Sequence, residues 1–389
     1  MNSVKKGHLM ELPSRVLIGY DIIEEFGNFL TDLGIDKPVL FVGGKNVHST
    51  VDDIIAKSME TSQLSFDWKI IDSATTSVTD DVSEFCKSNN YGIIVGIGGG
   101  KSVDVAKLSS YRANLPFVSF PTSASHDGIS SPFASIKGSD RPYSFVASPP
   151  LGIFADIKII SQAPDRLLAS GCGDLIAKIT AIKDWELARD NSGEKFRNYA
   201  ASLSYMSSQI LFDESLNFSD NKNDSVRNIV EALISTGVAA GIAGSSRPCS
   251  GSEHLISHAL DIVSPNNGLH GEKCGMASIA MSKLHGLDWQ EIRNALLRVN
   301  CPTNVADLGI TADDILAYDL PADDLSKKDI EALNAELSDP RFADGWWQDQ
   351  INMMLEIGKK AEQQSLAKYG LDFVTDTYLP EKLGEMGLA

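Results

Sequence analysis

Cysteine is scarce in this chain, and its distribution argues against a disulfide framework. Only five of the 389 residues are cysteines, and these five are scattered and form no CxxC pair. Secreted domains that depend on disulfides are small and carry an even number of cysteines at close spacing. We therefore expect reduced, mostly packed thiols, which are typical of a cytoplasmic protein.

Long apolar runs and basic residues are also in short supply. No run reaches the roughly 18 apolar residues that a membrane-spanning helix needs. The basic N-terminal residues have no apolar stretch behind them and do not resemble a secretory signal. Lys and Arg total 34 against 52 Asp and Glu, a formal net charge of −18. This charge argues against non-specific binding to nucleic acid or to lipid surfaces, but a small anionic substrate remains compatible with it. Without a long apolar run, no membrane insertion is expected.

The first 160 residues alternate strand-like and helix-like segments. Residues 38–42 and 92–97 are continuous apolar runs, and residues 115–120 form a third. Strands that are buried on both faces and separated by helices are typical of a mostly parallel α/β sheet. We expect an α/β domain over residues 1–160.

The pattern changes beyond about residue 164, where strand signals nearly vanish. Helical spacing dominates, which predicts an all-α C-terminal domain over residues 161–389. The expected helical segments are 167–170, 174–190, 199–212, 225–243, 254–263, 274–285 and 288–299. Residues 305–345 are acidic and give little chemical information.

A glycine-rich turn follows the strand at 92–97. It consists of Gly98, Gly99, Gly100, Lys101 and Ser102, and a helical segment comes next. Glycines let the backbone approach a ligand closely, and a helix N-terminus attracts an anion, so a cofactor pyrophosphate is the natural occupant. The spacing is neither GxGxxG nor GxxxxGK[ST], so a glycine-rich corner without a ligand is the alternative.

A second polar loop follows the next strand, over residues 120–132. It is dense in hydroxyl groups and contains His126 and Asp127. In an open α/β sheet, ligands bind beyond the carboxyl ends of the strands, so this loop is expected near the glycine turn. A plain surface loop has a similar composition, because Ser, Thr, Asp, Gly and Pro are all common in turns.

The helical half contains a possible metal site. Asp174 lies in a Gly171–Asp174 segment that we interpret as the opening of a helix, and His254 and His258 share one helical face. His270 follows in a turn between glycines. Carboxylate and imidazole are ordinary ligands of zinc. Asp174 as a helix-terminal charge, or one histidine as a packed core residue, is the alternative, and spacing leaves open which two histidines bind.

Together these motifs resemble the superfamily of polyol and iron-containing alcohol dehydrogenases. The resemblance rests on Gly96–Asp104 (GIGGGKSVD), Ser125–Pro132 (SHDGISSP), Gly171–Asp174 (GCGD) and Leu269–Glu272 (LHGE). The second motif is similar to that of the glycerol-1-phosphate dehydrogenase branch in particular. The resemblance spans about residues 10–300 and implies a Rossmann-like N-terminal domain followed by a helical domain.

The resemblance also implies roles for individual residues. Asp174, His254 and His270 would bind Zn²⁺, and Asp127, Asp174 and His258 would contact the substrate. The catalytic candidates are the same three residues. The residues expected to bind NAD(P)H are Gly98, Gly99, Gly100, Lys101, Ser102, Thr122, Ser123, Ala124, Ser125 and Ser131.

The implied reaction reduces dihydroxyacetone phosphate with NAD(P)H to sn-glycerol 1-phosphate, the glycerophosphate backbone of archaeal lipids. No acid follows the strand at 38–42, so we expect NADPH to be accepted beside NADH, with Lys45 near the 2′-phosphate. Arg247, Lys273, Lys137 and Arg141 are all candidates for binding the substrate phosphate. A homo-oligomer is expected.

Three other functions remain open at this point. A glycerol dehydrogenase or an Fe²⁺ alcohol dehydrogenase would use an unphosphorylated substrate. A lyase of the dehydroquinate synthase kind would recycle its nicotinamide, and a non-catalytic protein would only bind metal or nucleotide. Similarity of fold does not decide among these chemistries.

Overall fold

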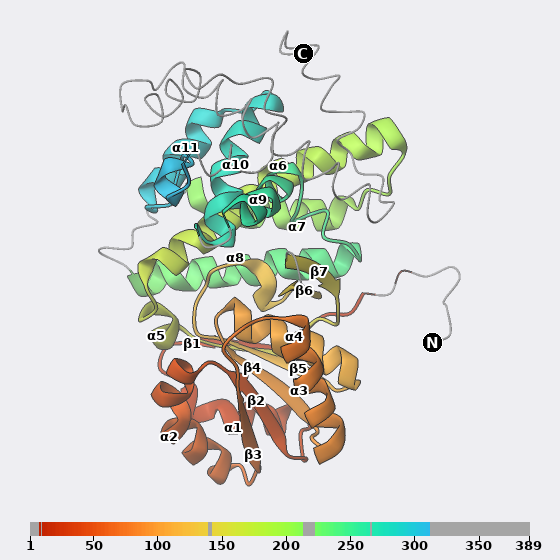
Figure 1. Cartoon of the computed structure of the whole chain (residues 1–389), viewed down its shortest axis with the longest axis vertical. Coiled ribbons are helices and arrows are strands. Elements are labelled where there is room, and N and C mark those ends of the chain that lie inside the picture. Colours follow the sequence, from red (N-terminus) through yellow and green to blue (C-terminus); the bar gives the residue numbers. More distant parts are fainter. Residues whose placement is uncertain (1–7, 9, 139–141, 213–221, 265–266, 312–389) are drawn as a thin grey trace.

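A six-stranded parallel sheet forms the centre of the N-terminal half (Figure 1). The computed structural model describes residues 8, 10–138, 142–212, 222–264 and 267–311. The sheet order is β1-β8-β5-β4-β2-β3, and all five pairings are parallel. The strands are β1 (Arg15–Gly19), β2 (Val39–Gly43), β3 (Phe66–Ile70), β4 (Ile93–Gly98), β5 (Phe117–Pro121) and β8 (Gly152–Asp156).

Helices cover both faces of this sheet. One face packs on α1 (Phe26–Asp32) and α2 (Lys45–Thr61), and the other on α3 (Thr76–Asn89) and α4 (Gly100–Ala113). Every residue of β2, β4 and β5 is buried, which is why these strands appear as continuous apolar runs in the sequence. The expected α/β class of the N-terminal half is confirmed.

The strand order reverses between β2 and β4. β3 lies on one side of β2, whereas β4, β5 and β8 follow on the other. Open α/β sheets bind ligands beyond the carboxyl ends of the strands at such a reversal. The loops that follow β2 and β4 are therefore the expected cofactor loops.

The sequence pattern did not anticipate β8 or a short hairpin beside the sheet. Strands β6 (Phe133–Lys137) and β7 (Pro142–Val146) pair antiparallel. Each is only five residues long, and in β6 only Ala134 and Ile136 are buried. Two buried positions in five residues give too weak an alternation to predict a strand.

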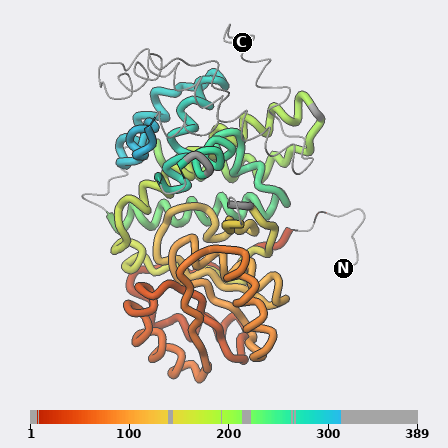
Figure 2. The backbone as a smooth tube through the Cα atoms, viewed as in Figure 1, coloured from red at the N-terminus to blue at the C-terminus, as the bar shows by residue number. Residues whose placement is uncertain are grey.

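Beyond β8, every element in the described residues is helical, which confirms the expected helical C-terminal half. The α-helices are α5 (Ile157–Ser161), α6 (Asp165–Ser192), α7 (Asn198–Ser208), α8 (Lys222–Ala243), α9 (Ser252–Val263), α10 (His270–Leu284) and α11 (Trp289–Arg298). Single 3-10 turns are η1 (Ile23–Glu25), η2 (Asp127–Ile129), η3 (Gln209–Phe212) and η4 (Ala306–Leu308). Figure 2 shows these helices, yellow-green to blue, stacked on the red and orange sheet half. The domain boundary at 160–161 stays a prediction.

Two expectations about the helical half were wrong. The Gly171–Asp174 segment does not open a helix, because α6 runs unbroken from Asp165 to Ser192. His270 is not in a turn, because it is the first residue of α10. Gly173 serves close packing of α6 on α10, because a Cβ there would lie 2.1 Å from the Gly271 carbonyl oxygen.

Helix α8 is long and apolar enough, by length and composition alone, to cross a membrane. Of its most apolar 18-residue stretch, 61% is buried inside the molecule. Ser130, in the loop after β5, donates a hydrogen bond to the carbonyl of Ile234 on α8 at 2.7 Å. Figure 1 shows α8 running along the junction of the two halves, as a core helix does.

Candidate active site

The two loops predicted to hold a cofactor begin side by side at one edge of the sheet. Gly98 at the end of β4 pairs with Pro121 at the end of β5, and the Thr122 amide donates to the Gly98 carbonyl at 2.9 Å. Gly98 has a φ of 144°, a conformation that favours glycine. The expected proximity of the two loops is therefore observed.

The Ser123 hydroxyl fits a cofactor that binds at this edge. Its Oγ is buried and has no hydrogen-bond partner among the residues the structure describes. A Cβ on Gly99 would lie 3.1 Å from it, so the hydroxyl faces the glycine turn. Buried hydroxyl groups almost always have partners, and a pyrophosphate oxygen at the N-terminus of α4 would supply one.

The other predicted cofactor residues lie around the same edge in different environments. Gly100 is the first residue of α4, and the Ser102 and Ala124 side chains are buried. Lys101 is exposed, and its Nζ donates to the Asp72 carbonyl at 2.9 Å. The Ser125 carbonyl accepts from the Ser170 hydroxyl at 3.1 Å, and the buried Ser131 Oγ accepts from the Phe133 amide at 3.2 Å.

His126 connects the glycine turn to the helical half. Its Nδ1 accepts from the Gly128 amide at 2.9 Å, and a Cβ on Gly100 would lie 1.9 Å from its Nε2. The centroid of its ring is 6.5 Å from that of His270. Glycine at position 100 therefore makes room for the imidazole as well as for a ligand.

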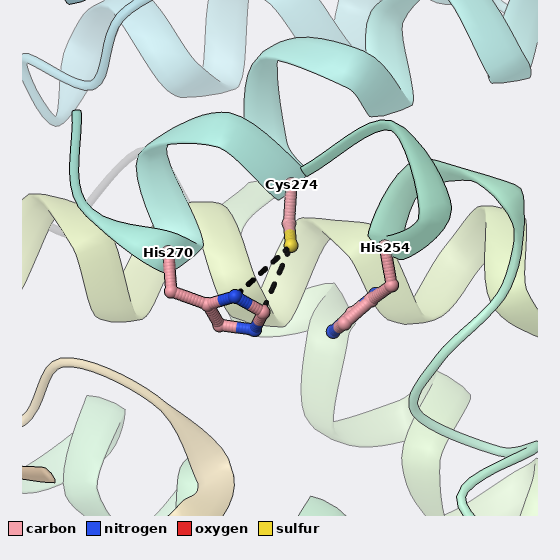
Figure 3. A group of neighbouring side chains, drawn as sticks. All are labelled: His254, His270 and Cys274. Carbon is pink, nitrogen blue, oxygen red and sulfur yellow. Dashed lines mark hydrogen bonds between the residues drawn. The ribbon is translucent and has the colours of Figure 1, made fainter. Parts of the chain in front are cut away.

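Helices α9 and α10 bring His254, His270 and Cys274 together (Figure 3). One nitrogen from each imidazole and the Cys274 Sγ lie within 4.8 Å of one another. His270 and Cys274 are four residues apart on α10, so they share one face. The His258 ring is also close, with its centroid 6.1 Å from that of His270.

Asp174 reaches the same cluster from the middle of α6. Its Oδ1 lies 3.6 Å from the His254 Nε2, and its Oδ2 accepts from the Asp127 amide at 2.8 Å. Asp174, His254 and His270 therefore converge, although they are far apart in the sequence. The donor set of one carboxylate, two imidazoles and an adjacent thiol is chemically suited to zinc.

Lys178 neutralises part of the negative charge at this cluster. Its Nζ lies 2.8 Å from Asp127 Oδ2, 2.9 Å from Asp174 Oδ1 and 3.2 Å from the Cys249 carbonyl, and the side chain is fully buried. An ammonium group has three N–H donors, and these three acceptors use all of them. Lys178 therefore orients the two carboxylates and has no donor left for a substrate.

The cluster shifts the pKa values of its members toward charged forms. Burial raises the pKa of Asp174, but Lys178 and His254 outweigh burial and hold that pKa well below its usual range. Burial lowers the pKa of His254, but Cys274 and Asp174 hold it well above its usual range. Burial opposes the Cys274 thiolate, yet His254 and His270 lower the pKa of the thiol to about 6. The imidazoles, the carboxylate and the thiol thus stabilise one another's charged forms.

Sequence reasoning missed Cys274 and Lys178, although a signal was available. Each lies four residues after a residue that was singled out, Cys274 after His270 and Lys178 after Asp174. On a helix that spacing places both residues on one face. A buried lysine was not expected, because lysine is almost never fully buried unless it is paired.

The candidates for binding the substrate phosphate mostly have other partners. Arg247 contacts both carboxylate oxygens of Glu194, at 2.8 and 2.6 Å. Lys273 is buried and pairs with Asp261 at 2.5 Å. Lys137 is exposed on β6, and Arg141 lies outside the described residues. The phosphate-binding residue stays open.

Comparisons with known proteins identify the family of this chain. The model of the iron-containing alcohol dehydrogenase family matches residues 17–164. The chain is 49% identical over 320 residues to a glycerol-1-phosphate dehydrogenase, NAD(P)+, of Nitrosopumilus maritimus (strain SCM1), covering 82% of this chain and 90% of that one. A protein of the same description from Metallosphaera sedula is 46% identical, with coverage of 79% and 88%.

Solved structures show the same fold at low sequence identity. Glycerol dehydrogenase of Schizosaccharomyces pombe superimposes with a TM-score of 0.70 at 20% identity, covering 92% of this chain and 93% of that one. A probable glycerol dehydrogenase of Sinorhizobium meliloti 1021 gives 0.68 at 18% identity, with coverage of 88% and 99%.

A second family model, the Toprim domain of the topoisomerase 6 and Spo11 proteins, matches residues 275–383. The described part of that range, 275–311, is helical and packs as part of the same helical half. Within the described residues 275–311, the match therefore adds no separate site to the fold.

Proposed function

This chain belongs to the family of NAD(P)-dependent glycerol-1-phosphate dehydrogenases, and we propose that it reduces the C2 ketone of dihydroxyacetone phosphate to sn-glycerol 1-phosphate. The proposed reaction consumes one NAD(P)H and one proton and yields NAD(P)+ and the alcohol. The observation that carries the proposal is the convergence of Asp174, His254 and His270 from three helices.

We propose that Asp174, His254 and His270 hold one Zn²⁺ and that Cys274 lies beside it. Three protein ligands with a position left for substrate are typical of catalytic zinc sites. When bound, the zinc ion polarises a ketone oxygen and the nicotinamide supplies a hydride. A buried carboxylate beside two imidazoles and a thiol supports a divalent cation rather than an anion at this place.

The chain's own residues would bind and orient the substrate. Lys178 holds Asp127 through Oδ2, so the second carboxylate oxygen is the one proposed to accept from a substrate hydroxyl. His258, one helical turn after His254, is proposed to contact the substrate and to relay the proton that the alcohol needs. Both oxygens of Asp174 have partners, so Asp174 is proposed to act as a ligand and not as a base.

The cofactor is proposed to bind along the sheet edge. The glycine turn, Ser123 and the N-terminus of α4 would hold its pyrophosphate. Lys45 is exposed and is the first residue of α2, which follows β2 at the strand-order reversal. This position supports acceptance of NADPH as well as NADH. We further propose a cytoplasmic homo-oligomer whose product enters archaeal membrane lipid synthesis.

The test is a spectrophotometric assay of NAD(P)H oxidation with dihydroxyacetone phosphate, followed by chiral analysis of the product. The expected product is sn-glycerol 1-phosphate, formed by the zinc-loaded protein and not by protein stripped with a chelator. The sn-glycerol 3-phosphate enantiomer, or no oxidation at all, would contradict the proposal.

Two further arms separate the alternative functions. A glycerol dehydrogenase would turn over unphosphorylated dihydroxyacetone at least as well as the phosphate ester. A lyase that recycles its nicotinamide would convert substrate without net NAD(P)H consumption. Loading the stripped protein with Zn²⁺ or Fe²⁺ in parallel then identifies the metal that supports the reaction.

A further inference from the structure

Glu253 carries a buried carboxylate beside His254, on the side of the ring away from Asp174. The proposed function gives this carboxylate no role. Glu253 is fully buried, and its Oε1 lies 2.7 Å from the His254 Nδ1. The same oxygen accepts from the Gly251 amide at 2.7 Å, and Oε2 accepts from the Thr180 hydroxyl at 2.8 Å. Every one of these contacts is of ordinary hydrogen-bond length.

This contact determines which nitrogen of His254 carries the proton. A carboxylate only accepts hydrogen bonds, so the nitrogen that faces Glu253 must be the protonated one. In a neutral ring that binds a metal, the proton is therefore assigned to Nδ1, and the Nε2 lone pair is the one that faces the metal. Nε2 is the atom that lies 3.6 Å from Asp174 Oδ1, on the side of the proposed metal.

The second imidazole of the cluster is held differently. The His270 Nδ1 lies 3.4 Å from the Ser257 hydroxyl, a long contact to a neutral group. Within the described residues, Glu253 is thus the carboxylate that orients a proposed imidazole ligand. A carboxylate behind a metal-bound histidine fixes the ring, selects its tautomer and raises its basicity.

We infer that Glu253 is a positioning residue for the metal centre, which acts through His254 and sets the affinity for zinc. The inference rests on the proposed function, because it needs a metal on His254. The competing explanation is purely structural: Glu253 caps the start of α9 through the Gly251 amide and ties α9 to α6 through Thr180.

The substitution Glu253→Gln separates the two explanations. Glutamine has the same shape, its carbonyl still accepts from the Gly251 amide and from His254, and its NH₂ donates to the Thr180 oxygen. The packing and the hydrogen bonds at the start of α9 therefore persist, whereas the negative charge that faces the His254 imidazole is lost.

The matched control is Glu272→Gln. Glu272 is also a buried acid in the first turn of a helix that carries a proposed ligand, and it accepts from the Leu269 amide at 2.6 Å. Its other contacts are to Arg166 at 2.7 and 2.8 Å, and the hydrogen bonds that the structure gives it involve no imidazole.

The readout is the dissociation constant of Zn²⁺, measured on stripped full-length protein by competition with a chromophoric chelator. We expect E253Q to bind zinc about 10- to 100-fold more weakly than wild type. E272Q should stay within about threefold, and the Tm of the zinc-free E253Q protein should match that of wild type within a few degrees. Equal zinc affinity in E253Q and wild type, or equal weakening in E272Q, would overturn the inference.

A measurement on the unaltered protein covers the case in which E253Q does not fold. Selective ¹⁵N labelling of histidine reports which nitrogen of each zinc-bound ring is protonated. The inference requires a protonated Nδ1 and a zinc-bound Nε2 on His254, and the reverse pattern would overturn it. Wild-type protein that binds no zinc at all would instead contradict the proposed function.

Discussion

Lys107 in the sheet half and Lys178 in the helical half are both fully buried and each has three polar partners, but the charges of those partners differ. Lys107 on α4 meets Asp104 at 3.0 Å and the carbonyls of Gly128 and Phe133 at 2.8 and 2.6 Å. Lys178 on α6 meets two carboxylates, Asp127 and Asp174, and a single carbonyl.

The difference lies in the balance of charge. Lys107 and Asp104 form a neutral pair that ties α4 to the loop after β5. Lys178 faces two carboxylates, and the buried Glu253 adds a third through His254, so the helical cluster has more negative than positive charge. Buried charges are costly unless they are compensated. The Lys107–Asp104 pair is thus neutral, whereas the cluster around Lys178 is suited to a further cation.

The largest expected effect comes from removing a ligand of that cation. His254→Ala should lower kcat/KM by at least about 10³-fold, because a polarising metal contributes several kcal/mol. Zinc content after dialysis should fall to background, measured by atomic emission. The control is His285→Ala, a similarly buried histidine that pairs with Asp184 at 2.7 Å, and this variant should keep its zinc.

The two lysines themselves can be compared directly. Lys107→Met and Lys178→Met should each reduce the free energy of unfolding by about 3–5 kcal/mol, because each leaves a buried carboxylate unpaired. Added zinc should raise the Tm of K178M more than that of wild type, since the metal replaces the lost positive charge. K107M should respond to zinc as wild type does. If zinc raised the Tm of K178M and K107M by the same amount in thermal unfolding, the two lysines would not differ in the charge that they balance.

The identity of the third ligand comes next. Asp174→Asn should weaken zinc binding by more than about 100-fold if the carboxylate is a ligand, whereas Cys274→Ser should weaken it by less than about 10-fold. The dissociation constants of both variants, from chelator competition, distinguish a site of one carboxylate and two imidazoles from one of two imidazoles and a thiolate. The reverse order would assign the ligand role to Cys274.

A smaller effect is expected at the sheet edge, where the binding groups are mostly backbone. Gly100→Ala places a Cβ 1.9 Å from the His126 Nε2, so the turn must shift. The KM for NAD(P)H should rise about 10-fold, equivalent to about 1.4 kcal/mol, with zinc affinity unchanged. The double variant with His126→Ala removes the clash and should recover part of the loss. No recovery would mean that the imidazole is not the cause.

The smallest expected effect is on cofactor choice. Lys45→Ala should raise the KM for NADPH about two- to fivefold, since an exposed ion pair contributes at most about 1 kcal/mol. The KM for NADH should not change. Steady-state kinetics with both cofactors measure these KM values. An equal change in the KM for NADPH and for NADH would contradict a contact between Lys45 and the 2′-phosphate.

The sheet edge was largely predictable from the sequence, because its signals are contiguous. β4 is an unbroken apolar run, β5 is interrupted only by Ser119, and the two polar loops follow them directly. Parallel strands pair side by side with their carboxyl ends at the same edge of the sheet. The loops that follow β4 and β5 therefore lie together, whatever packs around them. Local sequence was enough because the binding groups are backbone amides and hydroxyls beside the strands that position them.

The helical cluster was only partly predictable, because packing between distant segments creates it. The spacing of His254 and His258 was visible, but the role of Gly173 was misinterpreted: a glycine needed for the contact of α6 with α10 looks like a helix start. Glu253 and Lys178 were missed because their burial depends on the assembled helices, and charged residues are ordinarily expected at the surface.

Anomalous diffraction at the zinc absorption edge tests the central claim most directly, on crystals of the full chain grown with Zn²⁺ and NAD(P)H. The account predicts one strong peak per chain, within about 2.0–2.2 Å of Asp174 Oδ1, His254 Nε2 and a nitrogen of His270. No peak at this place, or a peak bound elsewhere, would contradict it.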